Sequence, residues 1–110
     1  MPALILLFFL YLPFSQTGQT RDYCSLHGSV YVEKDRKNAD FLAYVEESEA
    51  FADLIVYKES NKLFADRPGL WHFVDSRNFA DFTIFFVKDK GLAHFSIHYT
   101  DAPSFAGCNR

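Results

Sequence analysis

A short motif recurs along this chain at nearly constant spacing, and it constrains the fold more than any other feature. In each copy an alanine is followed by a polar residue and then by a run of apolar and aromatic residues, and successive copies start 13, 13, 15 and 13 residues apart. The copies begin at Ala39-Asp40, Ala52-Asp53, Ala65-Asp66, Ala80-Asp81 and Ala93-His94. A fixed short period indicates a repeat architecture, in which each unit is stable only against its neighbours. We therefore expect the 110-residue chain to stack or wind copies of one small unit.

When the alanine is taken as position one, the copies align in columns that overall composition does not explain. A degenerate first copy, Leu26 to Asn38, fits the same frame, and the third copy carries two extra residues at Arg67-Pro68-Gly69, a turn signal. Position three is large and apolar in Phe41, Leu54, Phe82 and Phe95. Position five is apolar in Val30, Ala43, Val56, Trp71, Ile84 and Ile97. Position six is a ring in Tyr31, Tyr44, Tyr57, His72, Phe85 and His98, and the last position is Phe51, Phe64, Phe79, Leu92 and Phe105.

Each apolar run predicts a β-strand. The runs are five to seven residues long and rich in Tyr, Phe, Val and Ile, as strands are. A helix is the rival interpretation for residues 39–50, and it is rejected because sister copies such as 82–87 are dense in β-branched and aromatic residues. Positions nine to twelve carry turn residues. Both faces of each predicted strand carry large side chains that need cover, so we expect an all-β domain whose strands wrap around one another.

The first 20 residues differ in character from the rest. Residues 3–12 form a ten-residue apolar run, too short for a membrane span and typical of a signal-peptide core, although no Lys or Arg precedes it. We therefore expect a signal peptide over residues 1–20, a single domain over residues 21–110, no membrane span in the mature chain, and a secreted or periplasmic location. An uncleaved membrane anchor is the alternative.

Export changes the interpretation of the two cysteines, Cys24 and Cys108. Outside the cytoplasm an even pair indicates a disulfide, here between the start and the end of the mature chain. Two unrelated thiols are the alternative.

Two stretches, Phe51-Ala-Asp-Leu-Ile-Val-Tyr57 and Phe79-Ala-Asp-Phe-Thr-Ile-Phe85, carry a family resemblance. Tandem 13-residue units of this form resemble the small bacterial domain named for a 7(1) septoil knot, and the resemblance covers about residues 28 to 107. It implies an all-β domain in which two stretches of chain coil about each other with seven crossings. Periodicity alone indicates an unknotted solenoid or a small barrel. The family has no established activity, so the resemblance assigns no functional residue.

The repeated polar position and the histidines are candidates for metal ligation. The position-two column, Asp40, Asp53, Asp66 and Asp81 with His94 in the fifth copy, lacks the Gly-rich turns of calcium-binding repeats, so we interpret it as turn-shaping. His94 and His98 lie four apart on a strand, too far to share one ion, and His72 and His98 stand in the ring column, where we expect a packing or surface role. We expect no metal and no cofactor.

The ring column is the best candidate for a binding surface. Tyr31, Tyr44, Tyr57, Trp71, His72 and His98 would supply the stacking and hydrogen-bonding groups that recognise a glycan or a protein. Rings at regular spacing also form cores, so the column supports either interpretation.

Neither catalysis nor nucleic-acid binding is indicated. No nucleophile with a motif-placed base, metalloprotease motif or phosphate loop occurs, and Lys and Arg are scattered rather than clustered. We expect a non-catalytic exported domain of a bacterial protein, whose topology confers resistance to unfolding and proteolysis. The alternative is a cell-envelope recognition module that binds glycan or protein, and a hydrolase is a third class.

Overall fold

The described part of the protein, residues 22–109 of a computed structural model, contains seven strands and seven short 3-10 turns and no α-helix. The strands are β1 (Gly28–Val32), β2 (Phe41–Val45), β3 (Leu54–Lys58), β4 (Leu70–Phe73), β5 (Phe82–Phe86), β6 (Phe95–Tyr99) and β7 (Gly107–Cys108). The 3-10 turns are η1 (Tyr23–Ser25), η2 (Arg36–Asn38), η3 (Glu49–Phe51), η4 (Lys62–Phe64), η5 (Arg77–Phe79), η6 (Lys90–Leu92) and η7 (Pro103–Phe105). Each predicted apolar run is a strand, and the rival helix over residues 39–50 is excluded by β2.

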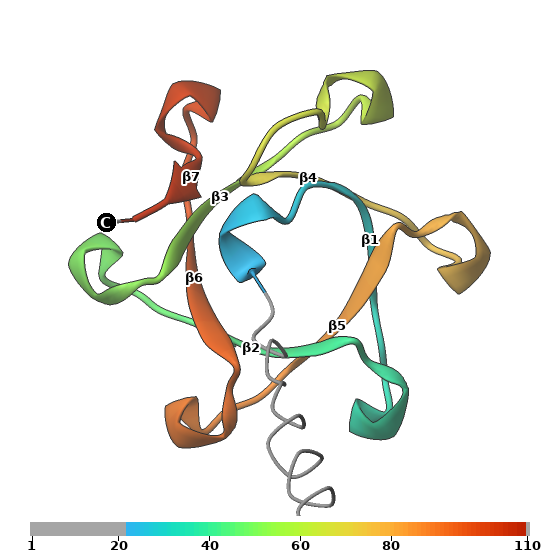
Figure 1. The fold of residues 1–110 in the computed structure, drawn as a ribbon, viewed down its shortest axis with the longest axis vertical. Coiled ribbons are helices and arrows are strands. Elements are labelled where there is room, and N and C mark those ends of the chain that lie inside the picture. The colour runs from blue at the N-terminus through green and yellow to red at the C-terminus, as the bar shows by residue number, and fades with distance from the viewer. Residues whose placement is uncertain (1–21, 110) are drawn as a thin grey trace, which may run out of the picture.

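Six strands close into a parallel barrel that the chain winds around twice. The order is β4-β1-β5-β2-β6-β3, and β3 also pairs with β4, which closes the ring. Strands β1, β2 and β3 form the first winding, and β4, β5 and β6 of the second winding follow between them (Figure 1). Only β3 and β4 are neighbours both in sequence and in the barrel. This excludes a solenoid, in which consecutive copies stack, and it is the interwound all-β architecture that the resemblance implies.

The register is the same at every interface, which is why a strict repeat can build a closed ring. Position five of one strand lies beside position three of the next, as in Val30 beside Phe82 and Ala43 beside Phe95. The same two-residue offset recurs at the other four interfaces, so six steps of two residues give a shear number of 12. The offset is about twice the one residue per strand of an eight-stranded α/β barrel, so the strands are strongly tilted.

The odd positions fill the barrel interior in layers. All six position-five side chains, the smallest Ala43 and the largest Trp71, are completely buried. Position three adds the buried Phe41, Leu54, Phe82 and Phe95, whereas Gly28 and Gly69 stand at position three in the other two copies. On the outer face, position four is mostly buried under the returning chain, but every position-six ring is only half-buried. The expectation that both faces are covered therefore holds only in part.

Between strands the chain forms six projecting lobes, which we define as positions eight to thirteen of each copy. Each lobe contains one 3-10 turn, η2 to η7, and the lobes project around the barrel in Figure 1. In four lobes the side chain at position ten caps the turn by accepting a hydrogen bond from the backbone N–H two residues later, and these residues are Asp35, Asn61, Ser76 and Asp89. The predicted turn chemistry is confirmed at these positions.

Residues 22–26, which we call the plug, cover the N-terminal end of the barrel. In Figure 1 η1 lies in front of the ring of strands, at its centre. The Tyr23 ring stacks on Phe95 with centroids 5.0 Å apart. The Leu26 carbonyl accepts hydrogen bonds from the Trp71 indole Nε1–H at 3.1 Å and from the Gly69 backbone N–H at 3.0 Å. The plug therefore closes one end of the core.

The passage from β3 to β4 is the irregular joint of the repeat. The two extra residues allow adjacent strands to be joined, and Gly69 adopts φ +88°, a conformation that favours glycine. A Cβ atom there would lie 2.6 Å from the Ile55 carbonyl oxygen, and it would also meet the backbone of β7, which pairs with β3 antiparallel. The insertion thus lets the first winding pass into the second.

Candidate functional site

The position-two residues link neighbouring strands rather than shape turns. The carboxylate of Asp53 accepts hydrogen bonds from the Ser96 backbone N–H at 2.9 Å and from its hydroxyl at 3.3 Å, while the Asp53 N–H donates to the Ser96 hydroxyl. Asp40 and Thr83 exchange the corresponding bonds, and Asp81 accepts from the Ser29 N–H at 2.8 Å. The expectation of local turn-shaping by this column is corrected, because its partners lie 43 to 52 residues away.

Two members of the column differ. His94 replaces the carboxylate with a ring nitrogen: its Nδ1 accepts from the Leu42 N–H at 2.9 Å, which requires the neutral ring to carry its proton on Nε2. Asp66 lies at the irregular joint and is exposed there. The column is therefore structural where the barrel is regular, and its separated carboxylates do not form a calcium site.

In His72 and His98, unlike His94, the ring nitrogen Nδ1 is a hydrogen-bond donor. In each, Nδ1 lies 2.9 to 3.0 Å from the backbone carbonyl of a position-eight residue, Glu59 and Glu46 respectively, so Nδ1 carries the proton. Both rings are half-buried on the outer face. Within residues 22–109, no three His, Cys, Asp or Glu side chains cluster closely enough to hold a metal ion.

The predicted binding surface is divided by the structure. Trp71 is completely buried, packs edge-on against Phe82 at 5.2 Å and belongs to the core, so its assignment to an exposed surface is corrected. Its column is position five, whose side chains point inward. The other five residues, Tyr31, Tyr44, Tyr57, His72 and His98, are half-buried and distributed around the barrel. They do not converge on one site.

A shallow surface pocket of about 320 Å³ lies beside one of these rings. It is lined by Lys58, Glu59, Ser60, His72 and Phe73. The Lys58 ammonium lies 4.4 Å from the centroid of the Tyr99 ring and 5.8 Å from that of Phe73, so an aromatic surface holds it in place. Residues that carry an amine, a hydroxyl and an imidazole therefore line one concavity, which can exchange hydrogen bonds with a small polar ligand.

The most exposed apolar residues are in the lobes. Position thirteen is Phe or Leu in five of the six lobes, and these side chains are 51 % to 69 % exposed. They are Phe51, Phe64, Phe79, Leu92 and Phe105, and Leu63 beside them is 79 % exposed. An apolar column in a repeat usually indicates core, so sequence reasoning gave no signal that this column faces solvent.

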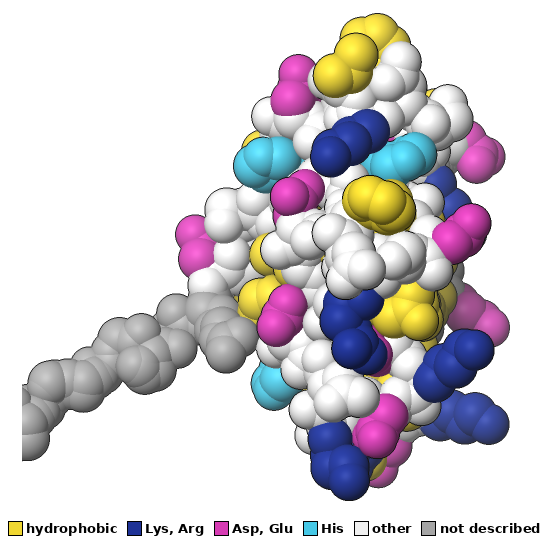
Figure 2. All heavy atoms as spheres, turned by 90° about the vertical axis from the view of Figure 1, so that its right-hand side faces the viewer, with side chains coloured by type: hydrophobic (Ala, Val, Ile, Leu, Met, Phe, Trp, Pro, Cys, Tyr) yellow, Lys and Arg dark blue, Asp and Glu magenta, His cyan; other side chains and the backbone are white. Residues whose placement is uncertain are grey.

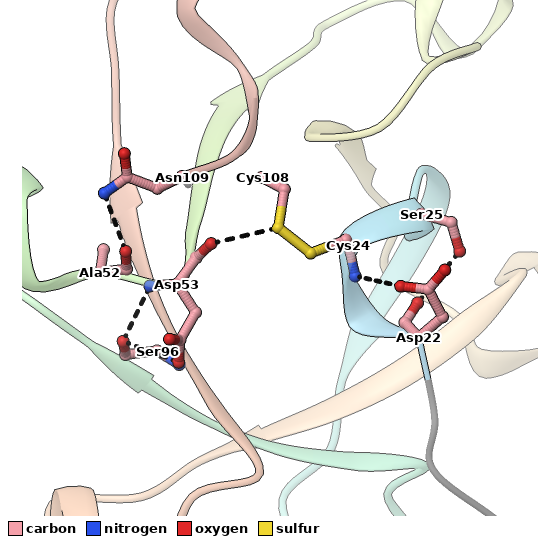
Figure 3. Close-up of a disulfide and its surroundings, with 8 residues drawn as sticks. All are labelled: Asp22, Cys24, Ser25, Ala52, Asp53, Ser96, Cys108 and Asn109. Carbon is pink, nitrogen blue, oxygen red and sulfur yellow. Dashed lines mark hydrogen bonds between the residues drawn. A yellow bond between two sulfur atoms is a disulfide. The ribbon is translucent and has the colours of Figure 1, made fainter. Parts of the chain in front are cut away.

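The predicted disulfide is present and joins the plug to the barrel. Cys24 in η1 is bonded to Cys108 in β7, 84 residues later, with Cα atoms 5.0 Å apart (Figure 3). Asp22 fixes the plug side by accepting a hydrogen bond from the Cys24 N–H at 3.1 Å. On the barrel side, the Asn109 side-chain amide donates to the Ala52 carbonyl at 2.9 Å. The bond is consistent with an extracellular or periplasmic location.

Two ion pairs at equivalent positions connect the lobes. Arg77 forms a bidentate pair with the buried Glu33, both N–O distances being 2.7 Å, and the hydrogen bond raises the pKa of Arg77 above its ordinary value. The corresponding pair, Lys90 and Glu46, is looser at 3.2 Å. Burial raises the pKa of Tyr99 to about 12. The two ion pairs therefore link lobes that are far apart in the sequence.

Comparison with known proteins gives a family match over most of the chain. A model of the 7(1) septoil knot domain matches residues 23–109. No curated protein and no solved structure matches the chain. None of the helices in the described part of the chain is long and apolar enough to cross a membrane. The predicted signal peptide, residues 1–20, lies outside the described residues.

Proposed function

The chain belongs to the 7(1) septoil knot domain family, and from this premise we propose that it is an exported, non-catalytic bacterial domain whose role is to remain folded outside the cytoplasm. The observation that carries the proposal is the Cys24–Cys108 disulfide, which locks the plug onto the barrel. Because the bond joins the plug to β7, the plug cannot leave the barrel unless β7 moves with it. The apolar run at residues 3–12 supports export.

The topology supports kinetic stability in particular. Because second-winding strands are paired between first-winding strands, unfolding any strand other than β3 or β4 breaks two interfaces formed with distant parts of the sequence. Contacts of this kind form slowly and separate slowly. We therefore expect slow unfolding and slow proteolysis, and both quantities depend on the disulfide.

The test measures unfolding rates and protease half-lives of residues 22–110, which contain the whole barrel, the plug and both cysteines. The oxidised domain is expected to unfold at least about a hundredfold more slowly than a Cys24→Ser, Cys108→Ser variant. Equal rates for both forms, together with degradation as fast as that of an ordinary small β-protein, would refute the role. A reporter fused after residue 20 tests export separately, and its retention in the cytoplasm would refute that part.

A second candidate function is glycan recognition, and the pocket beside His72 favours it. The pocket is lined by hydrogen-bonding residues and the aromatic Phe73, the combination that sugar rings engage. Saturable binding to an array of neutral, amino and acidic oligosaccharides, lost in His72→Ala and retained in His98→Ala, would support it. Because Trp71 is in the core, its substitution is not an informative test.

A further inference from the structure

The exposed lobe rings require an explanation, because they contribute nothing to the core. Phe51 and Phe105 are 68 % and 67 % exposed, and Phe79 is 69 % exposed. Burying a Phe side chain is favourable by about 1.5 to 3 kcal/mol, so leaving several in water forgoes that stabilisation. Exposed rings that recur at one repeat position indicate a contact surface.

The charges on the lobes separate into two sides of the molecule. We call residues 46–51 and 100–105, which contain η3 and η7, the acidic side, and residues 33–38 and 74–79, which contain η2 and η5, the basic side. These lobes face each other across the barrel in Figure 1. The acidic side carries four carboxylates and no Lys or Arg, for a formal charge of -4; the basic side carries four cations and three carboxylates, for +1.

Much of the charge difference between the two sides is carried by exposed side chains. On the basic side, Glu33 is buried beneath Arg77, and three exposed cations, Lys34, Arg36 and Lys37, outnumber the two exposed carboxylates of Asp35 and Asp75. On the acidic side, Glu46 is paired with Lys90 of the neighbouring lobe and the Arg67 side chain donates to the Pro103 carbonyl, while Glu47 and Glu49 are exposed and have no cation beside them in their own lobe. Figure 2 faces the η5 side of the barrel and shows exposed apolar groups together with Lys and Arg side chains, most of them in the lower half, and Asp and Glu side chains among them.

We propose that the acidic side of one copy docks on the basic side of a second copy, so that the chain associates head to tail. Phe51 and Phe105 would pack against Phe79 and the alkyl stems of Arg36 and Lys37, while Glu47 and Glu49 face the cations. Both sides carry exposed apolar groups, but their charges are opposite, so each side fits the other better than it fits itself. A head-to-tail contact between unlike surfaces does not close by a two-fold axis and produces short linear assemblies.

The contact area involves only two lobes on each side, so the association is weak and depends on charge. We expect a dissociation constant in the micromolar to millimolar range, weakened at least about tenfold when salt is raised from low to high concentration. This inference is independent of the proposed stability, because a monomer can be just as resistant to unfolding.

Sedimentation velocity of residues 22–110 over a wide concentration range tests the proposal with two charge-reversed variants. Glu47→Lys with Glu49→Lys reverses the acidic side, and Arg36→Glu with Lys37→Glu reverses the basic side. Each variant alone should associate at least about tenfold more weakly than the parent, because like charges then meet. An equimolar mixture of the two should regain association, because each reversed side then meets a complementary one.

Single substitutions in the lobes provide matched controls. Phe51→Asp should abolish association, whereas Leu63→Asp should not, although Leu63 is the more exposed residue, because η4 lies outside both sides. Thermal melts establish that every variant is folded. A parent that stays monomeric at all concentrations, or a mixture that does not regain association, would overturn the proposal. Binding of the parent to anionic vesicles without self-association would assign the basic side to a membrane instead.

Discussion

The two ends of the barrel are closed in different ways. At the C-terminal end of the strands, the second winding supplies its own lid: the position-seven rings Phe73, Phe86 and Tyr99 pack against the core. The first winding has Val32, Val45 and Lys58 at the same position, and all three are exposed. At the N-terminal end the closing group is a separate segment, the plug, held by a disulfide and two hydrogen bonds to one carbonyl.

The difference follows from what the repeat places at each end. Position three is the last inward position before the N-terminal end, and in two copies it is glycine, Gly28 or Gly69. Both glycines have positive φ and closely approach another segment, so neither site accepts a side chain. The end layer therefore has four side chains in six places, and Tyr23 and Leu26 of the plug pack against it. The repeat closes an end of the barrel without a separate segment only where the side chains of the end layer are large enough to fill it.

Removing the disulfide should have the largest effect, because it acts on the end that is closed by a separate segment. Cys24→Ser with Cys108→Ser opens a loop of 84 residues, and chain entropy predicts a loss of about 4 kcal/mol in the free energy of unfolding. Urea denaturation at neutral pH measures the loss, and reduced parent protein should match the variant. A loss below about 1 kcal/mol would show that the covalent bond contributes little to the stability of the domain.

Gly69→Ala tests whether the joint beside the plug tolerates a side chain. The positive φ and the crowding by Ile55 and Ala106 predict a loss of about 3 kcal/mol. The control is Gly91→Ala in the η6 lobe, where φ is ordinary and the nearest atom to a new Cβ is 3.4 Å away, so its effect should lie within about 1 kcal/mol of zero. Equal losses in the two variants would mean that the joint is not a special position.

A double-mutant cycle distinguishes the separate lid from the built-in lid. Tyr23→Ala and Phe86→Ala each remove a partly buried ring from one end, and each should cost about 2 kcal/mol in the oxidised protein. In the Cys-to-Ser background the cost of Tyr23→Ala should fall by about half, because the plug is then partly undocked, while the cost of Phe86→Ala should be unchanged. Thermal and urea denaturation of the parent, the Cys-to-Ser background and the two ring variants in each of them measure both couplings. If Phe86 were coupled to the disulfide as strongly as Tyr23, the two ends would not be independent.

The strands and the inner face of this barrel could be predicted from sequence because both depend on local pattern. Position five is apolar in every copy, and all six side chains are buried. The strand order could not be predicted, since a 13-residue period is equally compatible with stacking consecutive copies and with winding twice. The exposure of the position-thirteen column could not be predicted for a related reason. An apolar side chain tends to avoid water, but the sequence does not show whether another surface covers it.

The position-two residues show a different limit. In sequence, Asp after a turn indicates a local hydrogen bond, because Asp commonly bonds to the backbone two residues later. Here that role belongs to position ten, as in Asp89, whose carboxylate accepts from the Gly91 N–H at 3.0 Å. The carboxylate of Asp53 instead reaches Ser96, 43 residues away. Capping within a turn and bonding to a neighbouring strand can be told apart only when the strand order is known. Asp66 has the same sequence context as Asp53, so its exposed position at the joint could not be predicted.

The smallest expected effect is alkaline destabilisation at the built-in end. The pKa of Tyr99 is about 12 in the folded protein, above the ordinary value of about 10, so the unfolded chain loses this proton first. Between these values the unfolded state binds fewer protons, and stability therefore falls as pH rises from about 10 to about 12. Two pKa units correspond to at most about 2.7 kcal/mol, and partial exposure of the ring reduces the expected loss to about 1 to 2 kcal/mol.

Urea midpoints measured across this range after short incubations should decline in the parent and in Tyr44→Phe, which alters an outer-face ring, and less steeply in Tyr99→Phe. An equal decline in all three would place the alkali-sensitive group elsewhere, and if Tyr23→Ala then removed the decline, that group would lie at the plug end.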